Sequence, residues 1–103
     1  MKDCFVVKYI MVIFNLYINM KIFKFYAEWC GPCKALTKQL DTMNLSVEVI
    51  PIDIENDDKD LTTKFKIRSV PTLVFVDDNE NELERLTGSQ SNSAIENIIS
   101  KYA

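Results

Sequence analysis

Apolar and polar positions along the chain predict a regular succession of strands and helices from Met20 onward. Lys21 to Ala27 is a short β-prone run rich in aromatic residues, and it predicts a central strand that leads directly to Cys30. The apolar positions that follow recur at steps of three and four, as on one face of an amphipathic helix: Cys33, Leu36, Leu40 and Met43. Asn44 marks the predicted end of this helix.

A second strand and a short helix are predicted next. Val47 to Ile54 is strand-like, but Pro51 has no N–H to donate to a ladder and so favours a sheet edge or a strand end. The residues after this strand include caps and acids that suit a helix N-terminus: Asn56, Asp57, Asp58 and Asp60. Leu61 and Phe65 supply the buried side of a helix that ends near Lys66.

The C-terminal part predicts a β-hairpin followed by a helix. Thr72 to Val76 is a buried type of strand, and Glu82 to Thr87 is a more polar one. Turn residues at Asp77 to Asn81 join the two. Ser93, with Glu96 three residues later, has the form of a capping box. The apolar face of the last helix consists of Ile95, Ile98, Ile99 and Tyr102.

These elements follow one another in the order β-α-β-α-β-β-α. A helical crossover makes the first two strands parallel, whereas the hairpin makes the last two antiparallel. The sequence therefore predicts an α/β domain over residues 20–103, with a mixed β-sheet flanked by helices on both faces.

Residues 1–19 differ from the rest of the chain, because Phe5 to Ile18 is almost continuously apolar and is interrupted only by Lys8 and Asn15. The run is shorter than the roughly twenty apolar residues that span a bilayer, and it has neither a basic leader nor a small-residue cleavage site. Four interpretations stay open: a buried strand or helix of the domain, translation that starts at Met20, a membrane anchor, and an uncleaved signal-like segment. The first two are favoured.

Composition limits the chemistry of this chain. Its 103 residues, nearly half of them apolar and about a quarter charged, have the size and balance of one globular domain. A formal net charge of −3 leaves no excess of Lys and Arg for phosphate backbones, which disfavours nucleic acid as a partner. With no histidine and three cysteines, neither Cys–His catalysis nor an evenly paired disulfide scaffold is expected, so thiols or carboxylates must do the chemistry.

The most informative segment runs from Trp29 to Lys34, where two cysteines two residues apart lie at a predicted strand-to-helix junction. Such a pair can close a small disulfide ring. Cys30 lies at the helix start, where unpaired N–H groups and the helix dipole favour the thiolate, so we expect it to be the attacking nucleophile. Cys33, one turn further in, is expected to be more buried and to act as the resolving thiol. Gly31 permits the tight turn, and Pro32 suits the first helical turn.

Zinc sites use the same cysteine spacing and compete with redox chemistry as an interpretation. A structural zinc site takes four Cys or His ligands, and beyond Cys30 and Cys33 the chain offers only Cys4. The ligand count favours a redox-active disulfide, with no metal and no bound cofactor expected. A pair without catalytic function is a minor alternative.

The motif Trp-Cys-Gly-Pro-Cys-Lys at residues 29–34, together with Val-Pro-Thr at residues 70–72, resembles the thioredoxin family from about Met20 to the C-terminus. The resemblance implies a thioredoxin-like fold in a short member of the family. It also implies a cis Pro71 beside the dithiol and a Val70 backbone that hydrogen-bonds a bound substrate peptide. By the same resemblance, Gly88 leaves room for the partner and Trp29 belongs to the substrate-docking surface.

One position departs from the family. Where the resemblance implies a buried Asp that assists proton transfer to the resolving thiol, this chain has Lys24, and Val49 stands in place of the usual Lys partner. If Lys24 points toward Cys33, a cation there would lower the thiol pKa, whereas a buried neutral amine would act as a base. The alternative is a Lys24 that faces solvent or snorkels along the sheet.

The sequence thus predicts an enzyme that reduces disulfides in partner proteins through Cys30 and Cys33. By resemblance, a separate thioredoxin reductase drawing on NADPH would restore the dithiol. A cytoplasmic location is expected. A monomer is also expected, since nothing in the sequence indicates oligomers. Two alternatives stay open: a thioredoxin-like binding subunit of a larger complex, and a disulfide oxidoreductase tethered to a membrane through residues 5–18.

Overall fold

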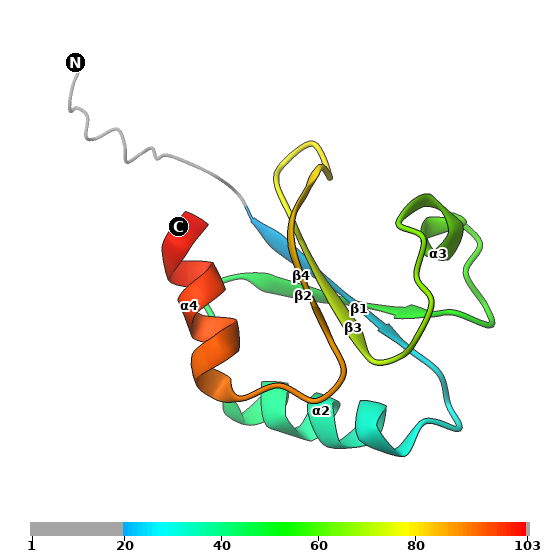
Figure 1. The fold of residues 1–103 in the computed structure, drawn as a ribbon, viewed down its shortest axis with the longest axis horizontal. Helices are drawn as coiled ribbons and strands as arrows, with labels where there is room; N and C mark the ends of the chain where they lie inside the picture. Colours follow the sequence, from blue (N-terminus) through cyan, green and yellow to red (C-terminus); the bar gives the residue numbers. More distant parts are fainter. Residues whose placement is uncertain (1–19, 103) are drawn as a thin grey trace.

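The computed structural model describes residues 20–102, which form a four-stranded sheet flanked by helices (Figure 1). Along the chain the elements are β1 (Lys21–Tyr26), α2 (Gly31–Thr42), β2 (Glu48–Asp53), α3 (Leu61–Lys64), β3 (Thr72–Val76), β4 (Glu82–Thr87) and α4 (Asn92–Tyr102). This confirms the predicted order β-α-β-α-β-β-α. Cys4 and the apolar run from Phe5 to Ile18, with its four interpretations, lie outside the described residues.

The sheet has the strand order β2-β1-β3-β4. β1 pairs in parallel with β2, because α2 carries the chain back to the start of the sheet between them. β1 and β3 are antiparallel, as are β3 and β4, so the predicted mixed sheet is confirmed. Among the described strands β2 has one neighbour, and Pro51 therefore lies on an edge strand, where its missing N–H costs no ladder bond.

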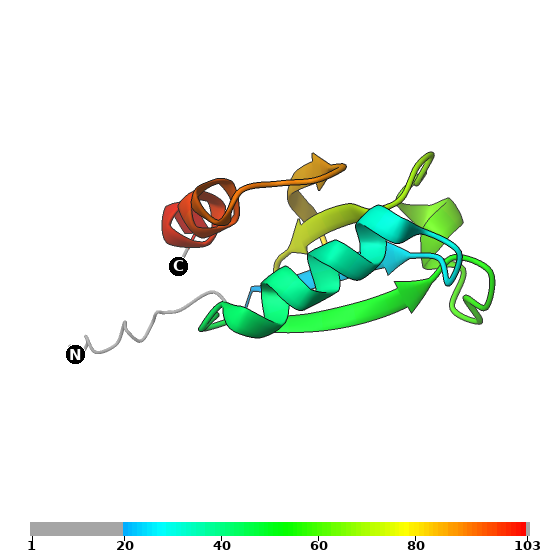
Figure 2. The same cartoon turned by 90° about the horizontal axis from the view of Figure 1, so that it is seen from below.

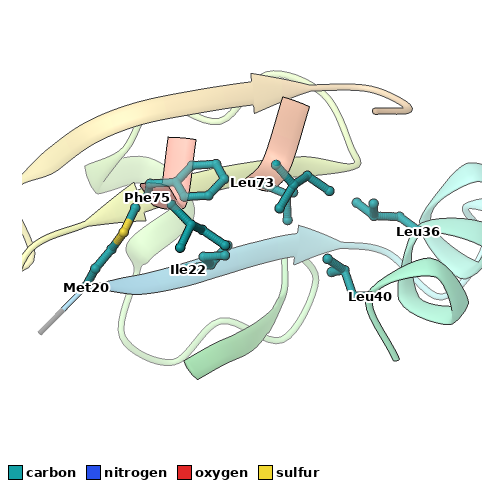
Figure 3. Packing of buried hydrophobic residues seen from close by; sticks show 8 residues of the cluster. Met20, Ile22, Leu36, Leu40, Leu73 and Phe75 are labelled. Carbon is teal, nitrogen blue, oxygen red and sulfur yellow. The ribbon is translucent and has the colours of Figure 1, made fainter. Parts of the chain in front are cut away.

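Each face of the sheet carries its own hydrophobic layer, because successive side chains of a strand point to opposite faces. Figure 3 shows the layer beneath α2 and α4, which includes Ile22, Leu73, Phe75, Leu36, Leu40, Ile95 and Ile99. The layer beneath α3 consists of Phe23, Phe25, Leu61, Phe65, Val74 and Val76. Helices therefore cover both faces, as predicted, and α2 runs lengthwise along its side of the sheet (Figure 2).

The start of α4 differs from the sequence-based expectation. Ser91 is the residue that caps it, since its Oγ accepts a hydrogen bond from the Ala94 N–H at 3.1 Å. The predicted capping box at Ser93 and Glu96 is wrong, because the helix begins at Asn92 and Ser93 already lies within it.

Among the acidic residues before α3, it is Asp57 that hydrogen-bonds to the first turn of this helix. Asp60 directly precedes the helix in a left-handed conformation (φ 57°) and makes no capping hydrogen bond with its side chain. The Asp57 carboxylate instead accepts bonds from the N–H and the hydroxyl of Thr62, both at 2.6 Å. These bonds tie the loop after β2 to the first turn of α3.

Candidate active site

The two cysteines lie where β1 gives way to α2. The Cys30 N–H donates to the Ala27 carbonyl at 3.1 Å, which closes the turn after the strand. Cys30 has an extended backbone and is the N-terminal cap of α2, with its Sγ accepting a hydrogen bond from the Cys33 N–H at 3.1 Å. A sulfur in this position faces the positive end of the helix dipole, which favours a thiolate there once the pair is reduced.

In this structure Cys30 and Cys33 form a disulfide, with a Cα–Cα distance of 5.2 Å. Both residues are buried, with exposed fractions of 4% and 2%, so the predicted excess burial of Cys33 is small. The cysteines pack with Ala27, and Val70 lies against the same cluster. The two sulfurs differ in their place on the helix: Cys30 is the N-terminal cap of α2, and Cys33 belongs to its buried face.

The second predicted motif lies against the dithiol. The Val70–Pro71 peptide bond is cis, as the resemblance implied. Among the described residues, no hydrogen bond uses the N–H or the carbonyl of Val70, so both groups are free for a partner. Gly88 donates its N–H to the Pro71 carbonyl at 2.8 Å. The structure thus places Val70, Pro71 and Gly88 side by side.

The two glycines of the predicted site differ in backbone conformation. Gly88 has φ +82°, in the left-handed region that favours glycine, although a Cβ there would meet no atom of the described chain within 4 Å. Gly31 has no positive φ and also faces open space. Gly31 lies in the first turn of α2, and its predicted role in the turn stays a prediction.

Trp29 presents its ring to solvent beside the dithiol. Its exposed fraction is 66%, and it is the one large hydrophobic side chain that is exposed among residues 20–102. The indole Nε1 donates to Glu55 Oε2 at 3.0 Å. Glu55 was not among the residues predicted for the site. The parallel pairing of β1 and β2 could have indicated it, because the carboxyl ends of parallel strands meet at the same edge of the sheet.

Lys24 points toward α2 and is half-buried. Its Nζ donates to Thr37 Oγ1 at 2.8 Å and lies 5.7 Å from the centre of the Tyr26 ring. Burial lowers the pKa of Lys24, and the Asp41 carboxylate opposes this effect. Thr37 was not among the predicted site residues, although it follows Cys33 by four positions and therefore shares its face of the helix.

A cavity of about 350 Å³ opens beside Cys33, between the end of β1 and α2. Its wall includes Tyr26, Glu28, Thr37 and Lys38. Burial raises the pKa of Tyr26, and the carboxylates of Asp53 and Glu28 raise it further. The cavity connects the side of α2 that holds Cys33 to solvent.

Two further properties concern residues 20–102 only. Within this range, His, Cys, Asp and Glu side chains form no group of three or more that could hold a metal ion. The same range contains no helix with the length and apolarity needed to cross a membrane.

Known proteins match this chain over most of its length. The family model described as Thioredoxin matches residues 13–101. The chain belongs to the thioredoxin family. Its family, fold and enzyme class are therefore as predicted, and the protein is a thiol–disulfide oxidoreductase. The match begins inside the apolar segment, so the division between residues 1–19 and 20–103 stays a prediction.

Individual thioredoxins show how similar the relatives are. The thioredoxin of Chlamydia pneumoniae is 35% identical over 82 residues, which cover 77% of this chain and 78% of that protein. The thioredoxin of Chlamydia trachomatis is 32% identical over 87 residues, covering 82% and 83%. A solved mutant thioredoxin from Halobacterium salinarum superposes with a TM-score of 0.73 at 32% identity, covering 82% of this chain and 74% of that one. Thioredoxins exchange electrons with protein disulfides through their redox-active disulfide and need no prosthetic group.

Proposed function

We propose that this thioredoxin reduces disulfides in protein substrates, with Cys30 as the attacking nucleophile and Cys33 as the resolving thiol. The observation that supports these roles is the bond from the Cys33 N–H to Cys30 Sγ at the N-terminus of α2. A helix N-terminus stabilises negative charge on the capping sulfur more than on the sulfur three residues further into the helix. Cys30 is therefore the sulfur that ionises first.

The reaction consists of two exchanges between sulfur atoms. The Cys30 thiolate attacks one sulfur of the substrate disulfide, so that a mixed disulfide forms and the other substrate sulfur leaves as a thiolate. Cys33 then loses its proton and attacks Cys30 Sγ, which closes the Cys30–Cys33 disulfide and releases the second substrate sulfur. The two substrate sulfurs take up two protons, and two electrons pass from the dithiol to the substrate.

Substrate docking is proposed at the surface formed by Trp29, Val70, Pro71 and Gly88, next to exposed Gly31 and Pro32. No hydrogen bond within residues 20–102 uses the N–H or the carbonyl of Val70, which supports this role because an extended peptide can pair with both groups. Trp29, whose indole N–H donates to Glu55, exposes its ring next to the dithiol and offers apolar contact area to a substrate. The absence of a side chain at Gly88 keeps the approach to Pro71 open.

Lys24 is proposed as a positioning residue for the resolving step. Its ammonium group lies at Thr37, one helical turn beyond Cys33 on the same face of α2. A cation at this place favours the Cys33 thiolate by its charge and needs no direct contact with the substrate. Lys24 would thus act on the same resolving step as the buried carboxylate of the family pattern, but by stabilising the Cys33 thiolate and not by accepting its proton.

The same proposal extends to partners and location. A separate thioredoxin reductase that draws on NADPH is proposed to return the disulfide to the dithiol, with no cofactor bound to this chain. A reducing compartment such as the cytoplasm suits a protein that must be kept in its dithiol form. The proposed working form is a monomer.

An insulin-reduction assay with this reductase and NADPH tests the proposal. Wild-type protein should show turnover, and C30S should show none, because the attacking sulfur is lost. C33S should accumulate a mixed disulfide that a reductant releases, whereas C4S should resemble wild type. Turnover by C30S at the wild-type rate would contradict the proposal.

Two other functions predict different results. A binding subunit would retain its partner complex in a double C30S and C33S variant. A membrane-tethered oxidoreductase would stay with the membrane fraction after a carbonate wash, and a version without residues 5–18 would not.

A further inference from the structure

A hollow of about 610 Å³ lies next to the cis-proline loop, where the end of α3, the loop to Pro71 and strand β4 meet. The side chains that matter for its charge and position are Lys64, Lys66, Arg68, Ser69, Arg85 and Thr87. Four of these six are cationic, and one carboxylate, that of Glu82, also lines the wall. The hollow is thus strongly basic, although the whole chain has a net charge of −3.

Much of this positive charge is not neutralised. Arg85 is occupied: its guanidinium bonds both carboxylate oxygens of Glu82 at 2.7 and 2.8 Å and the Phe65 carbonyl at 2.7 Å. Lys66 and Arg68, in contrast, are exposed and form no ion pair within residues 20–102. Their charges are therefore available to a ligand.

The backbone after α3 fixes the position of Lys66 in the wall of the hollow. Lys66 follows α3 with φ 53°, a left-handed conformation that glycine or asparagine usually provides after a helix. Its N–H donates to the Thr63 carbonyl at 3.1 Å, and the Ile67 N–H donates to the Thr62 carbonyl at 2.9 Å. These bonds define where Lys66 leaves the helix.

Two residues that line the hollow, Arg68 and Thr87, are close in sequence to residues beside the dithiol. Arg68 precedes Val70 by two residues, and Val70 packs against Cys30 and Cys33. Thr87 precedes Gly88, whose N–H bonds the Pro71 carbonyl. A peptide paired with the backbone of Val70 would therefore lie next to residues that line the basic hollow.

The opposite side of the dithiol has the opposite charge. Glu55 follows β2 and holds the Trp29 ring, and Glu28 is exposed in the turn before Cys30. In the strand order β2-β1-β3-β4, Glu55 follows β2 on one side of β1, whereas the hollow lies on the β3–β4 side. Along the strand order, a substrate that approaches Cys30 thus meets the positive charge of the hollow on the β3–β4 side and the Glu55 carboxylate on the β2 side, while the exposed Lys34 and Lys38 belong to α2.

We propose that the basic hollow binds an acidic segment of the protein substrate, next to the cysteine that Cys30 attacks. This rests on the proposed function and names a substrate class for it: disulfides flanked by Asp or Glu. Complementary charge raises the rate of association with acidic substrates and disfavours basic ones. The hollow would therefore influence which substrate disulfides the protein reduces.

Three peptide disulfides of identical length test the proposal, with the reactive cysteine flanked by Glu, Gln or Lys residues. We expect kcat/KM for reduction to rank Glu over Gln over Lys, with about fivefold between Glu and Gln, as two exposed ion pairs would supply. The ratio should fall at high salt, because exposed charges are screened. A double K66Q and R68Q variant should reduce the Gln peptide at the wild-type rate and lose the preference for Glu.

The matched control is a double K59Q and K101Q variant, which loses the same charge at exposed sites outside the hollow and should keep the preference. Equal rates for all three peptides, or a preference that survives K66Q and R68Q, would overturn the inference. Loss of the preference when inorganic phosphate replaces chloride at equal ionic strength would assign the hollow to phosphate groups and overturn it as well. Failure to reduce even the Gln peptide would instead count against the proposed function.

Discussion

Replacing Lys24 by Gln should raise the pKa of the Cys33 thiol, because it removes a cation one helical turn away. Lys24 Nζ lies 2.8 Å from Thr37 Oγ1. Thr37 follows Cys33 by four residues, which is about 6 Å along a helix. For the magnitude we take a separation of about 7 Å between the ammonium nitrogen and the Cys33 sulfur. A Gln side chain can still donate to Thr37, so the substitution changes charge more than packing.

The size of the effect follows from this separation. Two unit charges about 7 Å apart interact by about 2.4 kcal/mol at a dielectric constant of 20 and by about 0.6 kcal/mol in water. Lys24 is partly exposed, so a value near 1 kcal/mol is appropriate, which corresponds to about 0.7 pKa unit. The sign is positive, since losing the cation destabilises the thiolate. Burial lowers the pKa of Lys24 itself, so the effect should fade as alkaline pH removes the ammonium proton.

The assay is an NMR titration of the reduced protein with carbon-13-labelled cysteine Cβ, in a C4S background so that two thiols are followed. K21Q is the matched control, because Lys21 lies at the other end of β1 and pairs with Glu80 at 3.6 Å. A Cys33 pKa that stays constant or falls in K24Q would refute the reasoning. So would an equal rise in K21Q.

Three further predictions concern stability, measured as the free energy of unfolding in urea. Replacing Ser91 by Ala should destabilise the protein by about 1 kcal/mol through loss of the α4 cap, and the same change at Ser93 should have little effect; equal losses would contradict the assigned cap. Replacing Gly88 by Ala should cost about 1 kcal/mol, because alanine is strained at φ +82°; an unchanged value would show that the backbone relaxes freely. Burial alone would raise the pKa of Asp57, but hydrogen bonds from the side chain and backbone of Thr62, together with those from the backbone of Leu61 and Lys59, lower that pKa. Stability from Asp57 is thus present above its unfolded-state pKa and lost as pH falls through the lower folded-state value. A D57N variant should show a smaller loss on acidification than wild type, and an identical acid profile would refute this role.

The order of elements was predictable because it depends on local information. Hydrophobic periods of two and of three to four residues distinguish strands from helices within a few positions. The parallel pairing of β1 and β2 followed from the helix between them. The dithiol at a strand-to-helix junction and the cis bond at Pro71 followed from two short motifs. The cap of α4 was misplaced because two serines, Ser91 and Ser93, compete for one helix start and the sequence does not show which N–H each can reach.

Contacts between distant segments were decided by tertiary structure alone. Lys24 meets Thr37, and Trp29 meets Glu55, only because the sheet aligns the ends of β1 and β2 with α2. Three cations of the basic hollow, Lys64, Lys66 and Arg68, alternate along one stretch of the sequence, but only folding brings Arg85 and Thr87 of β4 to them. Short-range patterns predict which helices and strands form, and the short motif predicts where along the chain the reactive cysteines lie. Long-range proximity depends on sheet register and helix packing, so the charge surrounding the dithiol emerges only in the folded chain.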